Sequence, residues 1–333
     1  MSKYPKVNYI GNKEKITEWI IDEFPISNGT VLDLFSGGCS VSYALKEKGF
    51  SVISNDVLYS NYIISKAIIE NSNDKLDKSI FNINIDNDVI NKKYKNIRFL
   101  SDKLYFDYEV KELAKLLAIS DTLIGYNRYI FLALLRRAMI RKLPYSRMNV
   151  PWEQIKLLRD EEYSYLKYKR RRAYHNQSFT EHMIENIDAY NNSIFSNNEC
   201  HAYNLDVLDM INEIDFVDAV YMDPPYPSTM NNYDSFYGSF DEMFNLKKRH
   251  IDFTHKNTFL ENMELIIKML YGKTKNIIIS QNSRVQPSPS DMKNMLERHG
   301  KVVIKEKKHN YQVTGKDNKN ENIELLFVLE LKG

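Results

Sequence analysis

The stretch Thr30-Val31-Leu32-Asp33-Leu34-Phe35-Ser36-Gly37-Gly38 decides the fold. Its first half is apolar enough for a buried strand, and its second half is a loop of small residues. A helical pattern follows as far as Gly49, and Ser51–Ser54 predicts a second strand. Glycines let a backbone approach a ligand closely, and ligands bind outside the carboxyl ends of such strands. The unit therefore predicts an α/β fold with a ligand at Gly37-Gly38, although an ordinary turn is the alternative there.

Asp56 ends the second predicted strand, 23 residues after Asp33. An acid at about this distance can bind ribose hydroxyls, as it does in dinucleotide-binding folds. The third spaced glycine of the dinucleotide fingerprint is missing, which disfavours a nicotinamide dehydrogenase. A nucleoside ligand without pyrophosphate fits better. The alternative for Asp56 is a cap on the helix predicted from Tyr59 to Asn71.

A later short apolar strand, predicted in Asp218–Met222, runs into Asp223-Pro224-Pro225-Tyr226. Proline fixes its own φ and pushes the preceding residue out of the helical region, so a stiff, extended loop is expected. Such a loop can hold its carbonyls and the Asp223 carboxylate as one array of acceptors, with an aromatic ring beside it. That array suits a planar base with an exocyclic amine. The alternative is a strand end followed by a Pro-Pro turn.

The final third of the chain alternates strands and helices. Its predicted strands are 199–203, 275–280, 301–313 and 322–331, and its predicted helices are 258–271 and 291–299. The last two strands can pair as a hairpin, which gives the sheet an antiparallel edge. Between the strands, a polar and aromatic loop is predicted to close over a substrate; it contains Asn231, Asn232, Tyr233, Phe236 and Tyr237.

The middle of the chain is strongly basic. Residues 71–96 read as a polar surface excursion, and helices are predicted over 99–117 and 119–142. Between Arg128 and Tyr174 there are 13 Lys and Arg but only 4 Asp and Glu, in a chain of net charge +2. Basic residues interleaved with aromatics are typical of a phosphate-binding surface, and a solvated helix face is the alternative. The candidate DNA contacts are Arg136, Arg137, Arg141, Lys142, Lys169, Arg170, Arg171 and Arg172.

Composition excludes several classes of protein. With 333 residues and 43% apolar residues, the chain is long and apolar enough for a large globular core. Its longest apolar run, Tyr129 to Leu135, is too short to span a bilayer, and the first residues lack the apolar core of a signal peptide. Cys39 and Cys200 form no disulfide framework or zinc cluster, so no metal is expected. We expect a cytoplasmic protein.

The order of these motifs is specific: Tyr-x-Gly-x-Lys at residues 9–13, Asp-Leu-Phe-Ser-Gly-Gly, Asn-Asp, a basic insertion, a strand ended by Asp206, and Asp-Pro-Pro-Tyr. It resembles the alpha-class, Dam-like order of N6-adenine-specific DNA methyltransferases of type II and type IIS restriction-modification systems. The resemblance implies a Rossmann-like S-adenosylmethionine-dependent methyltransferase fold, mostly parallel with an antiparallel late hairpin. Residues 1–70 and 198–333 are expected to form the catalytic domain, and 71–197 an inserted, largely helical target-recognition region.

The resemblance also implies which residues hold the cofactor, S-adenosyl-L-methionine. Tyr9, Gly11 and Lys13 are expected near its methionine end, and Asp56 at its ribose hydroxyls. Asp206 is expected at the amine of its adenine, with the Val207 backbone alongside. Val207 departs from the aromatic common at that position, and Cys39 replaces a small residue of the loop. The residues expected to line the cofactor loop are Asp33, Phe35, Ser36 and Gly37, with Asp223 close by.

The catalytic loop implied by the resemblance is Asp223, Pro224, Pro225 and Tyr226. Asp223 and the Pro224 carbonyl are expected to accept both N–H bonds of an adenine amine, which directs its lone pair at the methyl group. The base must leave the double helix to arrive there, with Tyr226 stacking on it. The expected partners are double-stranded DNA and a cognate restriction endonuclease acting on the same site, with no membrane, and the chain is expected to be a monomer.

Two other functions compete with this interpretation. One is a base-amine methyltransferase acting on RNA or on cytosine-N4 of DNA, since the acceptor array is shared. The other is a catalytically silent protein that binds DNA and senses S-adenosylmethionine, against which the intact Asp223–Tyr226 loop argues. Cytosine-C5 chemistry needs a nucleophilic cysteine beside the base. Cys39 lies in the cofactor loop and Cys200 in a predicted strand, so neither is placed for it.

Overall fold

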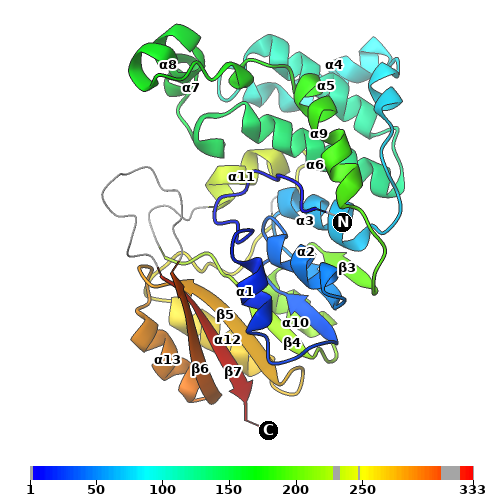
Figure 1. Cartoon of the computed structure of the whole chain (residues 1–333). Helices are drawn as coiled ribbons and strands as arrows, with labels where there is room; N and C mark the ends of the chain where they lie inside the picture. Colours follow the sequence, from blue (N-terminus) through cyan, green and yellow to red (C-terminus); the bar gives the residue numbers. More distant parts are fainter. Residues whose placement is uncertain (1–2, 228–232, 247, 309–322, 333) are drawn as a thin grey trace. The chain divides into compact units, whose positions relative to one another are not determined.

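The computed structural model describes residues 3–227, 233–246, 248–308 and 323–332. The chain forms two compact units, which are coloured along the sequence in Figure 1. The sheet unit comprises Asn12–Val57, Asn197–Tyr233 and Lys248–Gly333. The helical unit comprises Met1–Gly11, Leu58–Ser196 and Asp234–Lys247. Each unit has its own buried core and is described separately.

The sheet unit is built on seven strands in the order β3-β2-β1-β4-β5-β7-β6. The strands are β1 (Thr30–Asp33), β2 (Ser51–Asn55), β3 (Cys200–Tyr203), β4 (Ala219–Met222), β5 (Asn276–Asn282), β6 (Gly300–Lys308) and β7 (Ile323–Leu331). The first five run parallel, and β7 lies antiparallel between β5 and β6. The predicted α/β sheet with an antiparallel edge is thus confirmed, while residues 309–322 of the predicted hairpin lie outside the described part.

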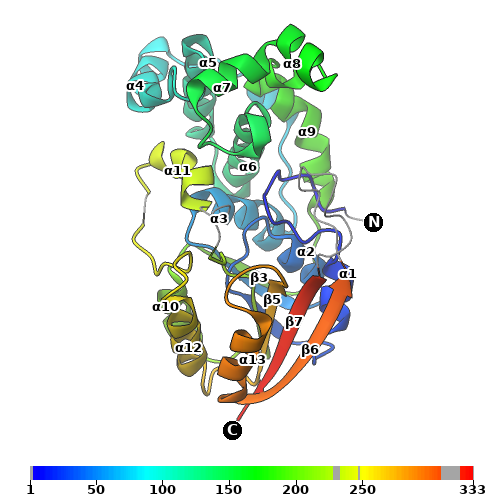
Figure 2. The same cartoon turned by 90° about the vertical axis from the view of Figure 1, so that its left-hand side faces the viewer.

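Helices cover both faces of this sheet. Figure 2 shows α10 and α12 on one side of the sheet and α1 on the other. The helices are α1 (Thr17–Asp22), α2 (Ser40–Glu47), α10 (Val207–Glu213), α12 (Phe259–Met269) and α13 (Pro289–Glu297). Apolar residues of α10, α12 and α13 pack on β1, β4, β5 and β7 in one core, including Leu32, Val220, Ile279 and Phe327. Parallel strands buried on both faces explain why these segments read as continuous apolar runs.

The helical unit is organised around α6 (Gly125–Arg141), whose central residues from Ile130 to Ile140 are all buried. It packs against α3 (Tyr59–Ser65), α5 (Asp107–Ser120) and α9 (Phe179–Ser193). A π-helical turn, η1, continues α3 through Lys66–Glu70. The remaining elements are η2 (Lys78–Asn82), α4 (Asn87–Ile97), η3 (Arg98–Leu100), η4 (Pro144–Ser146), α7 (Trp152–Arg159), α8 (Glu161–Tyr168), η5 (Ala173–His175) and α11 (Tyr233–Glu242).

Several segments differ from the sequence-based prediction. The polar stretch 71–96 contains most of α4, whose start is capped by Asp86, accepting from the Asp88 amide. Residues 1–11, 58–70 and 234–247 were predicted with the catalytic domain but belong to the helical unit. In the second of these segments, Ile63, Ile64 and Ile68 are buried where α3 and η1 pack on α6. The predicted substrate loop is the helix α11 from Tyr233 onward, while Asn231 and Asn232 lie outside the described residues.

Candidate active site

Three carboxylates gather where the parallel strands β1, β2 and β4 end. Asp33 is the last residue of β1, Asp56 follows β2 directly, and Asp223 follows β4. The carboxyl ends of neighbouring parallel strands share one edge of a sheet. The charges of Asp223 and Asp56 both act on Asp33, which shows that the three acids form one electrostatic group. The structure therefore brings together the strand-end acids singled out from the sequence.

The loop after β1 is held in place by the end of β2. The Gly37 N–H donates to Asp56 Oδ2 at 2.9 Å, and the Ser36 N–H donates to the Asn55 carbonyl at 2.9 Å. Gly37 and Cys39 both have positive φ, at 50° and 64°. The left-handed conformation costs a non-glycine residue such as Cys39 about 1–2 kcal/mol. The loop is therefore a strained cradle that Asp56 stabilises through the amide of Gly37.

The alternative role of Asp56 as a helix cap is wrong. The residue at the start of α3 is Leu58, and it makes no side-chain cap. The first amides of α3, from Tyr59 and Ser60, donate instead to the two carboxylate oxygens of Asp241 at 2.8 Å each. Asp241 belongs to α11 of the same helical unit. Asp56 is therefore a loop-holding acid at the edge of the sheet.

Asp33 is the most deeply buried member of the group, with 1% of its surface exposed. Its Oδ2 accepts from the Ser42 hydroxyl at 2.6 Å, whereas its Oδ1 has no hydrogen-bond partner among the described residues. Burial raises the pKa of Asp33 to about 7, the Ser42 hydroxyl opposes the rise, and the charges of Asp223 and Asp56 add to it. A buried acceptor without a partner calls for a donor or a cation from a ligand.

Asp223 is joined to a lysine and a second acid. Lys13 Nζ lies 2.8 Å from Asp223 Oδ2 and 3.2 Å from Glu324 Oε1, so one ammonium bridges two carboxylates. Desolvation raises the pKa of Asp223 to about 6, Lys13 lowers it, and Glu324 raises it further. About 24% of the Asp223 side chain stays exposed, and the following Pro224 is buried. The carboxylate is therefore fixed, ionised at neutral pH and open to a ligand.

Two asparagines tie the strand ends to one another. The Asn55 amide nitrogen donates to the carbonyls of Leu34 and Leu205, and its oxygen accepts from the Leu205 N–H at 3.1 Å. In return, the Asn204 amide nitrogen donates to the carbonyls of Asp56 and Val57 at 2.8 Å each. These bonds cross-link the loops after β1, β2 and β3. The site is thus pre-organised by hydrogen bonds between asparagine side chains and the backbone.

The comparison with known protein families decides the identity of the chain. Residues 9–295 match the model of the D12 class N6 adenine-specific DNA methyltransferases, a span that contains Asp33, Asp56, Asp206 and Asp223. The chain belongs to this family. The membership confirms the resemblance drawn from the motif order and the expected adenine-specific DNA methyltransferase activity.

Individual relatives agree with the family. The chain is 45% identical to the Type II methyltransferase M2.HphI of Haemophilus parahaemolyticus, over 98% of each chain. It is 26% identical to the modification methylase StsI of Streptococcus sanguinis, over 98% of this chain and 52% of that protein. An 81-residue segment is 35% identical to the Type II methyltransferase M.CviAII of Paramecium bursaria Chlorella virus 1, covering 22% of this chain and 24% of that protein.

In this D12 methyltransferase, Asp206 is the N-cap residue that precedes α10. Its side chain accepts from the Leu208 N–H and from the Ile251 N–H, both at 2.9 Å. The carboxylate therefore caps the helix and anchors the segment that precedes α12. Val207 beside it is buried. Phe35, in the loop after β1, packs edge-on against Phe253 with ring centroids 5.3 Å apart.

Tyr226 is built into the core of the sheet unit. Its side chain is 4% exposed, its hydroxyl donates to the Ser280 carbonyl at 2.6 Å, and its ring packs on Phe259 with centroids 5.1 Å apart. The position of the ring is therefore fixed at both ends, which suits a rigid platform. Stacking on a base stays a prediction.

The first two residues of the Tyr-x-Gly-x-Lys motif lie in the helical unit, whereas Lys13 lies in the sheet unit. Tyr9 stacks on Tyr237 with centroids 5.3 Å apart and planes at 20°, and the Tyr237 hydroxyl accepts from the Ile10 N–H. Gly11 has a φ of 85°, a conformation that favours glycine. The predicted roles of Tyr9 and Gly11 near the cofactor stay predictions.

Three of the predicted DNA contacts are buried, so we correct that interpretation. Arg136 donates to the Val7 carbonyl and to Asn61, and Arg137 donates to the Lys6 carbonyl at 2.6 Å. Lys142 is 0% exposed. These cations tie the N-terminal segment and the helices of the unit together because buried carbonyls need donors. They do not form an exposed basic face.

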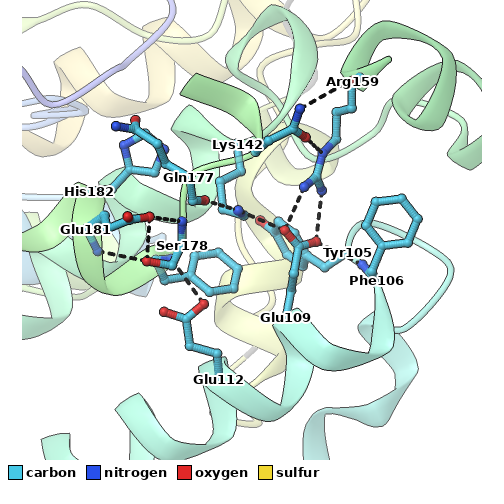
Figure 3. Close-up of polar contacts among 12 residues, drawn as sticks. Tyr105, Phe106, Glu109, Glu112, Lys142, Arg159, Gln177, Ser178, Glu181 and His182 are labelled. Carbon is cyan, nitrogen blue, oxygen red and sulfur yellow. Dashed lines mark hydrogen bonds and ion pairs between the residues drawn. The ribbon is translucent and has the colours of Figure 1, made fainter. Parts of the chain in front are cut away.

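Lys142 belongs to a buried ion cluster that Figure 3 shows in close-up. Both carboxylate oxygens of Glu109 accept from Arg159, at 2.7 and 2.8 Å, and Lys142 Nζ lies 2.8 Å from Glu109 Oε1. Lys142 also donates to the Gln177 carbonyl. The cluster joins α5, α6, α7 and the segment before α9 in the interior of the helical unit.

The other five predicted DNA contacts are accessible. Lys169, Arg170 and Arg171 are exposed, Arg172 is half-buried, and Arg141 is half-buried. Arg141 stacks on Tyr174 at 3.8 Å from the ring centre. Lys169 and Arg171 lie over Tyr165, Arg172 lies over Tyr168, and Arg171 pairs with Glu162. The exposed part of the predicted basic surface is thus the α8 end, residues 165–172, which we call the basic tip.

The described residues contain neither a cluster of metal-ligand side chains nor a helix that could span a membrane. No group of His, Cys, Asp and Glu in this part of the chain has the arrangement of a metal site. No helix in the described ranges is long and apolar enough to cross a membrane.

Sequence reasoning missed three residues of the site. Glu324 and Ser280 lie on strands that are remote in sequence from the motifs. Asn55 is adjacent to Asp56 in the sequence, but no role was predicted for its side chain. An acid inside the apolar strand Ile323–Leu331 was the available signal for Glu324, because a charge in a buried strand needs a partner. Asn55 had no such signal, since an asparagine at a strand end is common in turns.

Proposed function

We propose that this D12 methyltransferase transfers a methyl group from S-adenosyl-L-methionine to the N6 amine of an adenine flipped out of duplex DNA, as the modification enzyme of a type II restriction-modification system. The observation that carries the proposal is the Asp223 carboxylate, held at the end of β4 by Lys13 Nζ at 2.8 Å and grouped with Asp33 and Asp56. Relatives named type II methyltransferases support the restriction-modification context.

The residues after β1 and β2 fit the cofactor. S-adenosyl-L-methionine, when bound, supplies a methyl group made electrophilic by its positive sulfonium. Asp33 has a buried oxygen without a partner among the described residues, which suits a cationic or N–H-bearing group. Asp56 is placed for ribose hydroxyls, and its bond to the Gly37 N–H fixes the loop on which the ligand rests. No pyrophosphate-binding glycine pattern is needed for such a nucleoside.

Asp223 and Pro224 act on the target base. The amine of adenine is a poor nucleophile because its lone pair is delocalised into the ring. When the Asp223 carboxylate and the Pro224 carbonyl accept its two N–H bonds, a pyramidal nitrogen is favoured and its lone pair becomes available. Pro224 and Pro225 keep the acceptors in place, so the site needs little reorganisation. The exocyclic amine is reached only if the base leaves the double helix.

Sequencing that detects modified bases tests the proposal. DNA from cells expressing the chain should carry N6-methyladenine at one recognition sequence, and DNA from cells expressing Asp223→Ala should not. A mark on cytosine-N4, or in RNA only, would favour the competing base-amine enzyme. Absence of any mark, together with specific DNA binding by the purified protein, would favour the silent DNA-binding protein.

Replacing Asp56 with alanine should weaken cofactor binding. The change removes the ribose contact and releases the Gly37 amide, so the dissociation constant for S-adenosylmethionine should rise about tenfold, or 1.4 kcal/mol. Isothermal titration calorimetry measures it. Asp209→Ala, at an exposed acid of α10 in the same unit, is the matched control. Equal affinities for the two variants would leave Asp56 with no role in cofactor binding.

Replacing Arg170, Arg171 and Arg172 with alanine should weaken DNA binding and flatten its salt dependence. Each phosphate contact contributes about 0.9 to the slope of log K against log salt, so removing three arginines should lower the slope by up to about 2.7. Fluorescence anisotropy on a duplex oligonucleotide between low and moderate salt measures both quantities. Lys275, Lys301 and Lys308, exposed in the sheet unit, provide a control of equal charge. An unchanged slope would remove the basic tip from the interface.

A further inference from the structure

Glu324 is an acid in a place where burial should exclude one. It is the second residue of β7, it is 0% exposed, and it lies opposite Asn282 of β5. Its Oε1 accepts from the Ser280 hydroxyl at 2.6 Å and lies 3.2 Å from Lys13 Nζ. The family match ends at residue 295, so β7 lies beyond the matched span. A buried carboxylate is retained only where a partner or a function requires it.

The Lys13 ammonium is therefore shared between two carboxylates. Its ammonium touches Asp223 Oδ2 at 2.8 Å and Glu324 Oε1 at 3.2 Å. Asp223 must offer its oxygens to the amine of the target base, yet an ammonium bound to it competes for the same lone pairs. If Lys13 could pair only with Asp223, its ammonium would keep occupying the oxygen that must accept from the target amine. A second carboxylate lets the ammonium move away without being left unpaired in a buried site.

We propose that Glu324 is a positioning residue for methyl transfer, which takes over the Lys13 ammonium when the target amine binds Asp223. The inference rests on the proposed function, because it assigns the amine to Asp223. Ser280 holds Glu324 ready through its hydroxyl. The carbonyl of the same serine accepts from the Tyr226 hydroxyl, so one residue of β5 orients both Glu324 and the catalytic loop.

The charged and titratable groups that face Asp223 determine how its pKa responds when a neighbouring residue is substituted. Lys13 precedes α1, Glu324 lies on β7, and Asp33 ends β1. Tyr221 and Tyr226 also lie nearby, but burial raises the pKa of each well above its usual value, so both stay neutral. Lys13 lowers the pKa of Asp223 and Glu324 raises it. Removing Lys13 should thus raise the pKa of Asp223, and removing Glu324 should lower it.

The test is the dependence of the single-turnover methylation rate on pH, measured with a duplex oligonucleotide at saturating S-adenosylmethionine. The rate should fall as the pH drops through the Asp223 pKa, because a protonated carboxyl loses an acceptor. Glu324→Gln should move this acid limb to lower pH by roughly 0.5–1 unit and Lys13→Met should move it to higher pH. In Glu324→Gln the rate on the plateau should also fall about tenfold, because Lys13 stays on Asp223.

Glu330→Gln is the matched control, since Glu330 is an exposed acid on the same strand. Its profile should superimpose on that of the wild type. If Glu324→Gln folds and also superimposes, or if its acid limb moves upward, the proposal is wrong. If Glu324→Gln does not fold, Ser280→Ala takes its place, and an unchanged plateau rate in that variant would equally overturn the role of Glu324.

Failure of the proposed function gives a different result. A wild-type protein that methylates no adenine refutes the proposed reaction and leaves no rate to follow. The coupling of Glu324 to Asp223 can then be read from the carboxyl resonance of Asp223 by carbon-13 NMR titration. Equal titration midpoints in the wild type and in Glu324→Gln would show that the bridge itself is absent.

Discussion

Methylation of duplex DNA by the Asp223→Ala variant should fall about 10²- to 10³-fold, while the affinity for S-adenosylmethionine stays within a few-fold of the wild type. The loss is expected because the variant lacks the fixed acceptor that meets the amine, and removing one such pre-organised group costs roughly 10²–10³ in rate. Asp223→Asn keeps the shape of the side chain but loses the charge and one acceptor oxygen, so its methylation rate should lie between those of the wild type and Asp223→Ala. Radiolabelled methyl transfer and calorimetry measure the two quantities.

The control for this experiment is Asp215→Ala. Asp215 is exposed in the loop before β4, at the opposite end of the strand that leads to Asp223. Its removal should change neither turnover nor affinity. If Asp223→Ala retains substantial turnover, the acceptor role is refuted, and if it loses cofactor binding as well, Asp223 acts mainly on the cofactor.

Replacing Glu109 with glutamine should destabilise the helical unit by about 3–5 kcal/mol, the usual cost of removing one partner from a buried ion pair. The cause is that Arg159 and Lys142, 4% and 0% exposed, would be left without their shared anion. Chemical denaturation followed by circular dichroism measures the change, with attention to the unfolding of each unit because two units need not unfold together.

Glu162→Gln is the control for Glu109, because it removes the same group from an exposed pair with Arg171. Its unfolding midpoint should equal that of the wild type. Burial raises the pKa of Glu109, but the hydrogen bonds from Arg159 and the charge of Lys142 outweigh it and hold that pKa below its usual value. The stabilisation is present above the unfolded pKa and is lost as the pH falls through the lower folded pKa. A Glu109→Gln variant as stable as the wild type would show that the cluster contributes nothing.

The sheet and its acidic edge could be predicted because parallel strands impose simple rules. Each strand is a short apolar run, and the residues just after the carboxyl ends of such strands share one edge of the sheet. Asp33 and Asp56 were therefore expected at one edge once the first two strands were identified, and the family resemblance implied that Asp223 lies close to them. The hairpin of β6 and β7 was predicted from two adjacent runs near the end of the chain.

Charges were harder to place than strands. Arg136, Arg137 and Lys142 look like a basic helix face when only their spacing is considered, and no local signal says that carbonyls of Val7 and Lys6 will meet them. Glu109, the partner of Lys142, lies 33 residues earlier in the chain (142 − 109). Long-range pairing of this kind depends on how helices cross, and the sequence pattern does not contain that information.

Asp33 carries a consequence for how the protein can evolve. Its pKa rises from 3.8 to about 7, so the folded chain keeps a proton there that the unfolded chain has released. Folding stability therefore declines as the pH rises through this interval, by an amount of the order of a few kcal/mol. An asparagine at this position would escape that loss. Selection for folding stability alone would favour asparagine at this position. Selection for a charged side chain that can bind the ligand retains the aspartate, so the two selective pressures oppose each other at residue 33.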